Sequence, residues 1–453
     1  MTASTSGGKR TADQNHSSFR ENPGKSRVIA LILSLVLVLG VTAVLAVRSA
    51  RPQAQGSQNQ PAAAQQTQPA VDTLSNTAAP QTTGDPVAEP GQTPPQDGQF
   101  VVEREPTSVT LLAVGDNLMH ITCVNSGLQA DGTYNYDYMF QYMEDDLQNT
   151  DISCINQETP FVNDPSLYSN YPCFGGPTAI GDSLADVGFD LVTHATNHIW
   201  DKGEISFYDT LNLWKEHPEV TVLGIHETEE DSRQIKTINK NGIVISCLNY
   251  TYGLNGFVPS EDWMVDQLVD KDRIADDIAR AKACSDILIV FAHWGTEYLF
   301  EPTQEQQDWA QFFADEGVDV VIGGHPHVLE PLEVVTGKNG NEMICYYSLG
   351  NFISHQSYNY QMLGGLATLT ITKDNSGTYV SEYALEPTMT YMTFGANGYE
   401  FYGMKLRDYT DDMALYHHVP DCGTQTMWDL YYDIVGDTPE AQVEGFPSST
   451  QDA

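Results

Sequence analysis

Basic residues are scarce in this sequence. Its 453 residues include 21 lysines and arginines against 61 aspartates and glutamates, which gives a formal net charge of −40. Residues 1–51 hold seven of the basic residues and two acidic ones, a net charge of +5, so the rest of the chain carries −45. So acidic a surface repels nucleic acid and anionic lipid headgroups, and we expect no nucleic-acid partner. The charge fits either general solubility or avoidance of an anionic polymer or cell wall, and composition does not separate the two.

The sequence also lacks the cysteine pattern of a disulfide framework. Its seven cysteines are odd in number and form no C-x-x-C motif. Cys154, Cys247 and Cys345 lie within apolar runs, where a free thiol behaves as a small hydrophobic side chain. This pattern disfavours both structural disulfides and a cysteine-type zinc site.

One long apolar run stands near the N-terminus. Residues 28–47, "VIALILSLVLVLGVTAVLAV", carry no charge. A helix of this length crosses a hydrocarbon core of roughly 30 Å, whereas the apolar core of a signal peptide is usually about 7–15 residues. We predict an uncleaved transmembrane anchor at residues 28–47, although the "VRSA" that follows leaves cleavage open. Five basic residues precede the run and two follow it closely, which predicts a cytoplasmic N-terminus and an extracellular main domain.

The rest of the chain divides by composition. Residues 1–27 form a basic tail, and residues 48–106 are rich in Pro, Gln, Ala, Thr and Gly, as in a disordered linker. We place the main domain at residues 107–385 and an acidic C-terminal extension at 386–453, which is either a helical cap or a loosely ordered tail.

Apolar runs alternate with helical patterns along the main domain. The expected strands are "SVTLLAVG", "DISCIN", "FDLVTHA", "VTVLG", "GIVISCLNY", "DILIVFAH", "VDVVIGG" and "MICYYSLG". Helical spacing of apolar residues recurs in residues 266–286, and residues 303–317 read as a helix that ends at Gly317. This alternation predicts an α/β domain with a layered sheet covered by helices.

Polar residues repeatedly follow the expected strands, at the edge where open α/β sheets bind ligands. The clusters contain Asp116 and His120; Asn156 and Glu158; His194, Asn197, His198 and Asp201; His293, Glu297 and Tyr298; His325 and His327; and Ser348 and Asn351. Each cluster alone is weak evidence for a metal site, because a single histidine more often has a structural role than binds a metal.

The stretch "VDVVIGGHPHVLEP" is the most informative of these clusters. Proline pushes the residue before it toward extended geometry, and alternate residues of an extended segment point the same way. We therefore expect both imidazoles, His325 and His327, to converge on one centre.

Taken together, the clusters predict a divalent metal site. Six of the twelve histidines fall in them, beside carboxylates and Asn. Imidazole and carboxylate ligands suit Zn, Mn or Fe, whereas unrelated structural histidines are the alternative. In such a site, His293 or Glu297 could move protons, and Asn197 could hold a ligand or an oxyanion.

The ordered motifs "AVGDNLMH", "NQETP", "THATNHIWDKG", "AHWGTEY", "GGHPHVLEP" and "YSLGNF" resemble the CapA family of poly-γ-glutamate capsule biosynthesis proteins. That family is related to the calcineurin-like metallophosphoesterases, and the resemblance covers roughly residues 107–355. It implies a four-layer α/β/β/α metallophosphatase-like sandwich. It also implies a role in making, exporting or anchoring an anionic γ-linked glutamate polymer, with polymer-synthase membrane subunits as partners.

The resemblance also implies the ligands of one or two metal ions. They are Asp116 as the first-strand ligand, Glu158 as the bridging acid, Asn197 and His198 as the Asn-His motif, His293, and the pair His325 and His327. Two departures stand out. Leu118 occupies the place of the histidine in the Asp-x-His motif of metallophosphoesterases, and the second acid is a glutamate. They leave open a single metal ion, or a site that binds without hydrolysing.

The motifs and the composition are consistent with three alternative functions. The first is a membrane-anchored, metal-dependent protein of poly-γ-glutamate synthesis or export. The second is an extracytoplasmic metallohydrolase that cleaves a phosphoester or amide in wall metabolism. The third is a non-catalytic module that grips a polymer or a partner subunit.

Overall fold

The computed structural model describes residues 105–395, 398–436, 438–441 and 443. The predicted tail, transmembrane anchor and linker lie outside the described residues, apart from residues 105 and 106. Within the described part of the chain, no helix is both long enough and apolar enough to span a membrane.

The first sheet contains parallel and antiparallel strands, in the order β14-β13-β12-β1-β2-β3-β4, with β11 paired to β1. Strands β1 to β4 run parallel to one another, whereas β12, β13 and β14 form an antiparallel meander that pairs with β1 through β12. Its strands are β1 (Thr107–Leu118), β2 (Ile152–Gln157), β3 (Leu191–Thr193), β4 (Thr221–Leu223), β11 (Asn351–Ser354), β12 (Leu363–Asp374), β13 (Gly377–Gly395) and β14 (Gly398–Lys405).

The second sheet has the order β5-β6-β7-β8-β10-β9. Strands β6, β7, β8 and β10 are parallel, and antiparallel strands close both edges. Its strands are β5 (Lys236–Lys240), β6 (Ile243–Thr251), β7 (Ile287–His293), β8 (Val320–Gly324), β9 (Leu332–Thr336) and β10 (Glu342–Tyr346).

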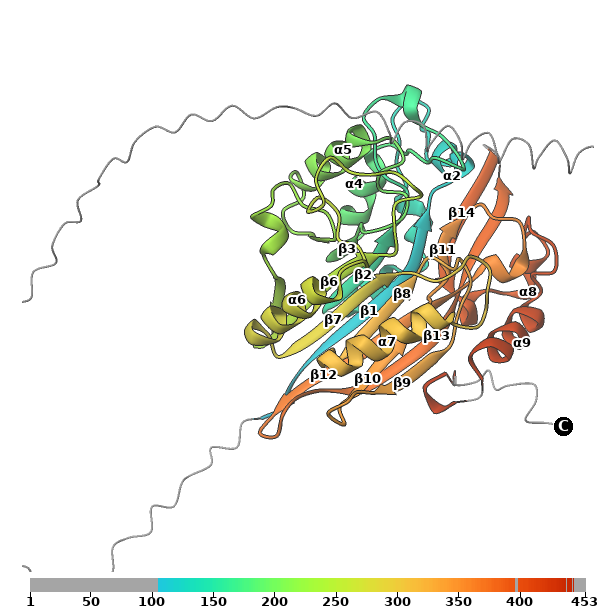
Figure 1. Cartoon of the computed structure of the whole chain (residues 1–453). Coiled ribbons are helices and arrows are strands. Elements are labelled where there is room, and N and C mark those ends of the chain that lie inside the picture. Colours follow the sequence, from blue (N-terminus) through green and yellow to red (C-terminus); the bar gives the residue numbers. More distant parts are fainter. Residues whose placement is uncertain (1–104, 396–397, 437, 442, 444–453) are drawn as a thin grey trace, which may run out of the picture. The chain divides into compact units, whose positions relative to one another are not determined.

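Helices connect and cover the strands (Figure 1). They are α2 (Ile121–Ser126), α3 (Glu144–Asn149), α4 (Ala179–Asp186), α5 (Glu204–Trp214), α6 (Lys271–Cys284), α7 (Gln304–Glu316), α8 (Asp411–Ala414) and α9 (Thr424–Val435). Helix α7 begins with a capping box between Thr303 and Gln306 and ends at Gly317, whose positive φ of 82° suits glycine.

Strand β7 shows how the layers pack. Its seven residues are all buried, as expected for a strand covered on both faces. Ile287, Ile289 and Phe291 join the core cluster that also contains the apolar side chains of β1 and β2. The alternate residues, Leu288 and Val290, pack instead with α6 and α7. The second sheet therefore lies between the first sheet and these two helices.

The α/β class and its main elements are confirmed. Each of the eight predicted strands is present, and both predicted helices occur as α6 and α7. Helix α6 begins later than predicted because the Asp270 side chain accepts hydrogen bonds from the backbone N–H groups of Asp272 and Arg273, which caps it there.

Six further strands were not predicted from the sequence: the antiparallel strands β5, β9, β12, β13 and β14, and the short β11. The boundary drawn between residues 385 and 386 falls inside β13. Beyond it, Phe401 of β14 and Tyr431 of α9 are buried in the same core cluster as β1.

Candidate metal centre

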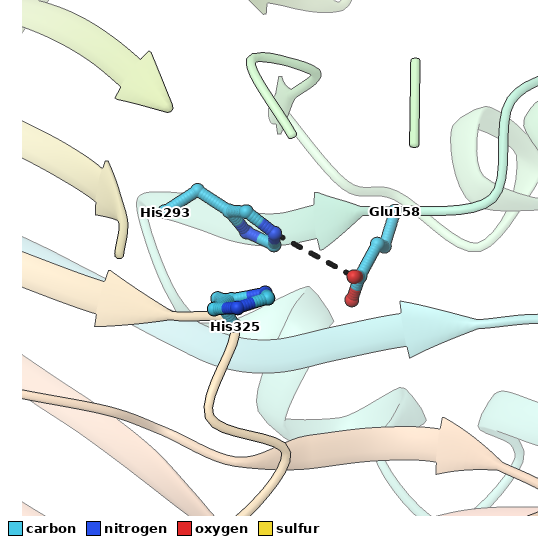
Figure 2. Close-up of side chains that lie close together, drawn as sticks. All are labelled: Glu158, His293 and His325. Atoms are coloured by element: carbon cyan, nitrogen blue, oxygen red, sulfur yellow. Dashed lines mark ion pairs between the residues drawn. The ribbon is translucent and has the colours of Figure 1, made fainter. Parts of the chain in front are cut away.

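Side chains from both sheets meet where the parallel strands end. Asp116 lies at the end of β1, and Glu158 follows β2 directly. From the second sheet, His293 ends β7, while His325 and His327 follow β8. Figure 2 shows Glu158, His293 and His325 directed toward one another.

Glu158 is at the middle of this group. Its side chain is fully buried, and neither carboxylate oxygen has a hydrogen-bond partner. Its Oε1 lies 3.5 Å from His293 Nε2, 3.7 Å from His327 Nε2 and 3.9 Å from His198 Nε2. A buried carboxylate with no donor is costly unless a cation neutralises it.

Two sets of ligand atoms share Glu158. In one set, atoms of Glu158, His293 and His325 all lie within 4.8 Å of one another, and in the other, atoms of Asp116, Glu158 and His327 do. Buried carboxylate and imidazole ligands at this spacing fit a divalent ion of the Zn, Mn or Fe type. The residues present therefore fit a metal, and Glu158 would be common to both sets.

The electrostatics of the group favour a charged carboxylate. Burial disfavours ionised Glu158, but the charges of His327 and His293 outweigh it and hold its pKa well below its usual range. For His327, burial lowers the pKa, yet Glu158 and the hydrogen bond to Asp116 raise it to about 9. The pKa of His325 is lowered, first by burial and then by the neighbouring histidines His293 and His327.

Asp116 orients other side chains of the centre. Its Oδ1 accepts a hydrogen bond of 2.7 Å from Asn156 Nδ2. Its Oδ2 accepts one of 3.1 Å from the backbone N–H of His325 and lies 3.1 Å from His327 Nδ1. A carboxylate held at Nδ1 of a histidine directs Nε2 toward the ligand site, so Asp116 fixes the ring of His327.

Asp201 does the same for His198. Its Oδ2 lies 2.7 Å from His198 Nδ1 and accepts a hydrogen bond of 2.6 Å from the backbone N–H of Phe174. From the sequence, Asp201 and Asn156 were predicted to lie in the polar clusters, but neither was predicted to have a role in the metal site. The spacing of three residues between His198 and Asp201, within one turn of chain, is the signal that could have identified the pair.

Asn197 contacts the centre through His293. Its Oδ1 lies 2.8 Å from His293 Nε2. The seven residues proposed as metal ligands from the sequence, Asn197 among them, therefore come together at one place.

The loop geometry expected for His325 and His327 is wrong. Neither residue is extended, because φ is +96° at His325 and +58° at His327. Such values are strained for non-glycine residues, and the hydrogen bonds from His325 and His327 to Asp116 help to hold them. Gly324 allows this close approach, since a Cβ atom there would lie 2.6 Å from Asp116 Oδ1.

Other predicted residues lie around the centre. His194 accepts a hydrogen bond of 2.7 Å from Trp214 Nε1, and burial lowers its pKa to about 3, so it is a structural histidine. His120 Nδ1 is 3.0 Å from the carbonyl oxygen of Leu118, and burial lowers its pKa to about 4. Glu297, proposed as a proton carrier, is partly exposed and lines a cleft that also reaches His198 and His327.

Comparison with known sequences gives a family match. The sequence model described as "Bacterial capsule synthesis protein PGA_cap" matches residues 110–356, just over half of the chain. The chain is 28% identical over 269 residues to the capsule biosynthesis protein CapA of Bacillus anthracis, which covers 57% of this chain and 62% of that protein. It is 28% identical over 251 residues to the PGA biosynthesis protein CapA of Bacillus subtilis (strain 168), covering 54% and 63%. The match thus spans less than two thirds of either relative.

Solved structures give more distant matches. NAD nucleotidase (NadN) of Haemophilus influenzae has a TM-score of 0.42 at 11% identity, over 77% of this chain and 59% of that one. The calcineurin-like phosphoesterase YfkN of Bacillus subtilis has a TM-score of 0.36 at 15% identity, over 62% and 91%. With TM-scores below 0.5, these structures assign neither an activity nor a substrate to the chain.

Proposed function

The chain belongs to the PGA_cap family of bacterial capsule synthesis proteins, and from this premise we propose that it is a membrane-anchored, metal-dependent protein of poly-γ-glutamate synthesis or export. Its relatives named for capsule and PGA biosynthesis support the polymer. The two-sheet α/β domain supports a metallophosphatase-like scaffold, the fold that the motif resemblance implies.

The main support for a bound metal ion is the environment of Glu158. This residue is a fully buried carboxylate without a hydrogen-bond donor, and nitrogen atoms of three histidines point to it at 3.5–3.9 Å. A divalent ion held there would polarise a phosphoryl or carbonyl oxygen of a bound substrate and lower the pKa of bound water to about 7.

Other residues of the chain would orient the histidines, supply a further oxygen atom and exchange protons. Asp116 and Asp201 hold the rings of His327 and His198, so both Nε2 atoms stay directed at Glu158. Asn197 Oδ1 would supply a neutral oxygen beside His293. Glu297, at the border of the cleft, would exchange protons with solvent.

The predicted transmembrane anchor supports a location at the cell membrane. The uncharged run at residues 28–47, with more basic residues before it than after it, is the basis for proposing a cytoplasmic N-terminus and an extracellular main domain. That arrangement would place the metal centre on the side where a capsule polymer accumulates.

A second candidate is metal-dependent hydrolysis of a phosphoester or amide. Glu297 favours it, because a carboxyl group at the border of the cleft beside the centre would protonate a leaving group. Leu118, an apolar side chain at the end of β1, argues against hydrolysis and so favours the first function. It stands where the metallophosphoesterase motif has a histidine, so the set of Asp116, Glu158 and His327 lacks that nitrogen ligand.

The test is deletion of the gene in its host, followed by complementation. We expect surface γ-glutamyl polymer to be lost, restored by the intact chain, and not restored by the variant with His325→Ala and His327→Ala. His217→Ala, which changes a surface histidine bound to Asp182, is the matched control and should restore the polymer. Unchanged polymer after deletion would contradict the proposed function. Turnover of a phosphoester or γ-glutamyl amide by the metal-loaded chain would favour the second candidate.

A further inference from the structure

The turn that follows β6 reaches the metal centre, although it belongs to none of the polar clusters predicted from the sequence. Residues 252–256, "YGLNG", come directly after Thr251, which pairs with His293 of β7 in the second sheet. The backbone N–H of Tyr252 donates a hydrogen bond of 2.9 Å to the carbonyl oxygen of His293. The ring of Tyr252 lies against that of His325, with centroids 4.6 Å apart. The turn is therefore fixed to two of the residues proposed as metal ligands.

An apolar contact joins the same turn to the segment that carries Asn197. Leu254 is buried, and it packs in one apolar cluster with Ala195 and Ile199, which flank Asn197 in the chain. Asn255, the residue after Leu254, is thereby brought beside Asn197, although 58 residues separate the two in sequence.

Asn255 fixes which end of the Asn197 amide faces the centre. Asn197 Nδ2 donates a hydrogen bond of 3.3 Å to Asn255 Oδ1, and Asn197 Oδ1 is left directed at His293 Nε2, 2.8 Å away. A flipped Asn197 amide would bring its oxygen against Asn255 Oδ1, with no proton between the two acceptors. The flip would also turn the NH₂ group toward the bound ion, and an asparagine binds a metal ion through its oxygen.

Tyr252 supports this orientation of Asn255. Its hydroxyl donates to Asn255 Oδ1 at 3.5 Å, a longer contact than the one with Asn197. At the other end of the amide, Asn255 Nδ2 lies 3.3 Å from His198 Nδ1, but that nitrogen is closer to Asp201 Oδ2, at 2.7 Å. Two donors therefore point at Asn255 Oδ1, and the contact with Asn197 is the shorter of them.

Backbone conformation gives another reason for an asparagine at this position. The φ angle of Asn255 is +51°, in the left-handed region where asparagine is among the few residues found besides glycine. Asn241, in the turn before β6, has a φ of +52°, and its Nδ2 donates to the carbonyl oxygen of Ser108 at 2.8 Å. Asn241 stands at the opposite end of β6 from the metal centre, so it is a matched control for Asn255.

We propose that Asn255 is a positioning residue of the metal centre, which holds the amide of Asn197 with its oxygen toward the bound ion. This inference rests on the proposed function, because it takes the centre to bind a divalent ion through Asn197. It adds the turn after β6 to the loops after β3, β7 and β8 as an element that builds the site.

The test is titration of the full chain with Co²⁺, followed by its visible absorption. Glycine is the replacement at both asparagines, because it adopts a positive φ without strain and removes only the side chain. We expect Asn255→Gly to weaken Co²⁺ binding by about tenfold, the low end of the loss that follows removal of a partner of a metal ligand. Asn241→Gly should leave the Co²⁺ affinity unchanged, and the two variants should unfold at similar urea concentrations.

A second pair of variants shows whether Asn255 acts through Asn197. Asn197→Ala should itself lower the Co²⁺ affinity, and adding Asn255→Gly should cause no further loss, because the effects of two residues that act through one contact do not add. The absorption spectrum of Co²⁺ bound to Asn255→Gly should also shift toward that of Asn197→Ala, since the amide oxygen is displaced in one variant and absent in the other.

Three results would overturn the inference: an unchanged Co²⁺ affinity of Asn255→Gly, an equal loss in Asn241→Gly, and a further loss of about tenfold when Asn255→Gly is added to Asn197→Ala. A parent chain that takes up no Co²⁺, Mn²⁺ or Zn²⁺ would instead refute the metal site on which the proposed function depends. Deletion that leaves the polymer unchanged would refute the proposed function and leave the role of Asn255 in metal binding intact.

Discussion

At the scale of single residues, Glu158 is a buried carboxylate whose charge a bound metal ion would neutralise. It is common to both sets of ligand atoms, and its oxygens have no hydrogen-bond partner. We expect Glu158→Gln to reduce the affinity for Mn²⁺ or Zn²⁺ by more than about 100-fold, because an amide oxygen carries no charge to offset that of the ion. Metal content of the purified chain and titration with Co²⁺, followed by its visible absorption, measure this. Unchanged metal content would exclude Glu158 as a ligand.

Asp201 would affect metal binding indirectly, because it holds the ring of His198. Loss of the carboxylate behind a metal-binding histidine typically lowers metal affinity by about 10–100-fold. Asp201→Asn should show this loss with the fold intact, since the amide oxygen can still accept the hydrogen bond from Phe174. Asp182→Asn breaks a similar pair with His217, 2.8 Å apart on the surface, and should leave metal affinity unchanged. Equal effects of the two substitutions would show that Asp201 has only a structural role.

At the scale of elements, Glu330 links the histidine loop to α7. The residue is buried, and its Oε2 accepts a hydrogen bond of 2.6 Å from Gln306 Nε2, in the first turn of that helix. Burial raises the pKa of Glu330 to about 8 despite this bond. The loop that carries His325 and His327 is therefore anchored to α7 by a carboxyl group that is largely protonated at neutral pH.

The stability of the chain should therefore fall in mildly basic solution. Because the folded pKa of Glu330 lies above the unfolded value, the proton stabilises the folded state fully below about pH 4.5, and this contribution is lost as the pH rises through about 8. Urea unfolding at pH 5, 7 and 9 should show a loss of about 4 kcal/mol between pH 5 and pH 9, from the rise of the pKa from 4.5 to about 8 at roughly 1.4 kcal/mol per unit of pKa. Glu330→Gln should flatten this dependence, whereas Glu342→Gln, at an exposed site on β10, should not. Parallel pH curves for the parent chain and Glu330→Gln would contradict the assignment.

At the scale of the whole molecule, charge is divided along the chain. The first 51 residues carry +5 and the rest −45, a division that fits the proposed cytoplasmic N-terminus and extracellular main domain. We expect the full chain to sediment with membranes, and deletion of residues 28–47 to release it. Cell fractionation, with protease added to intact cells, measures both location and orientation. A full chain found in the soluble fraction would contradict the anchor.

Much of the fold could be predicted because its signals are local. The eight runs of apolar residues became strands, and the Thr303 and Gly317 caps marked both ends of α7. The meander β12–β14 was missed because its exposed positions interrupt the apolar pattern. The meander's strand β13 is exposed or partly exposed over residues 377–384 and again over 393–395, and its continuous buried stretch is residues 387–392. Its pairing with β12 and β14 provides the order that the irregular sequence does not reveal.

By itself, the sequence determined which chemical groups stand at the strand ends, because glycine, proline and apolar periodicity act between near neighbours. Only the tertiary structure decided which of these groups face one another. His194 turns to Trp214, whereas His198, four residues later, turns to Glu158. Asp116 and His327 meet across 211 residues because two sheets pack face to face. Side-chain direction and sheet packing depend on the whole chain, so the metal centre is a property of the fold.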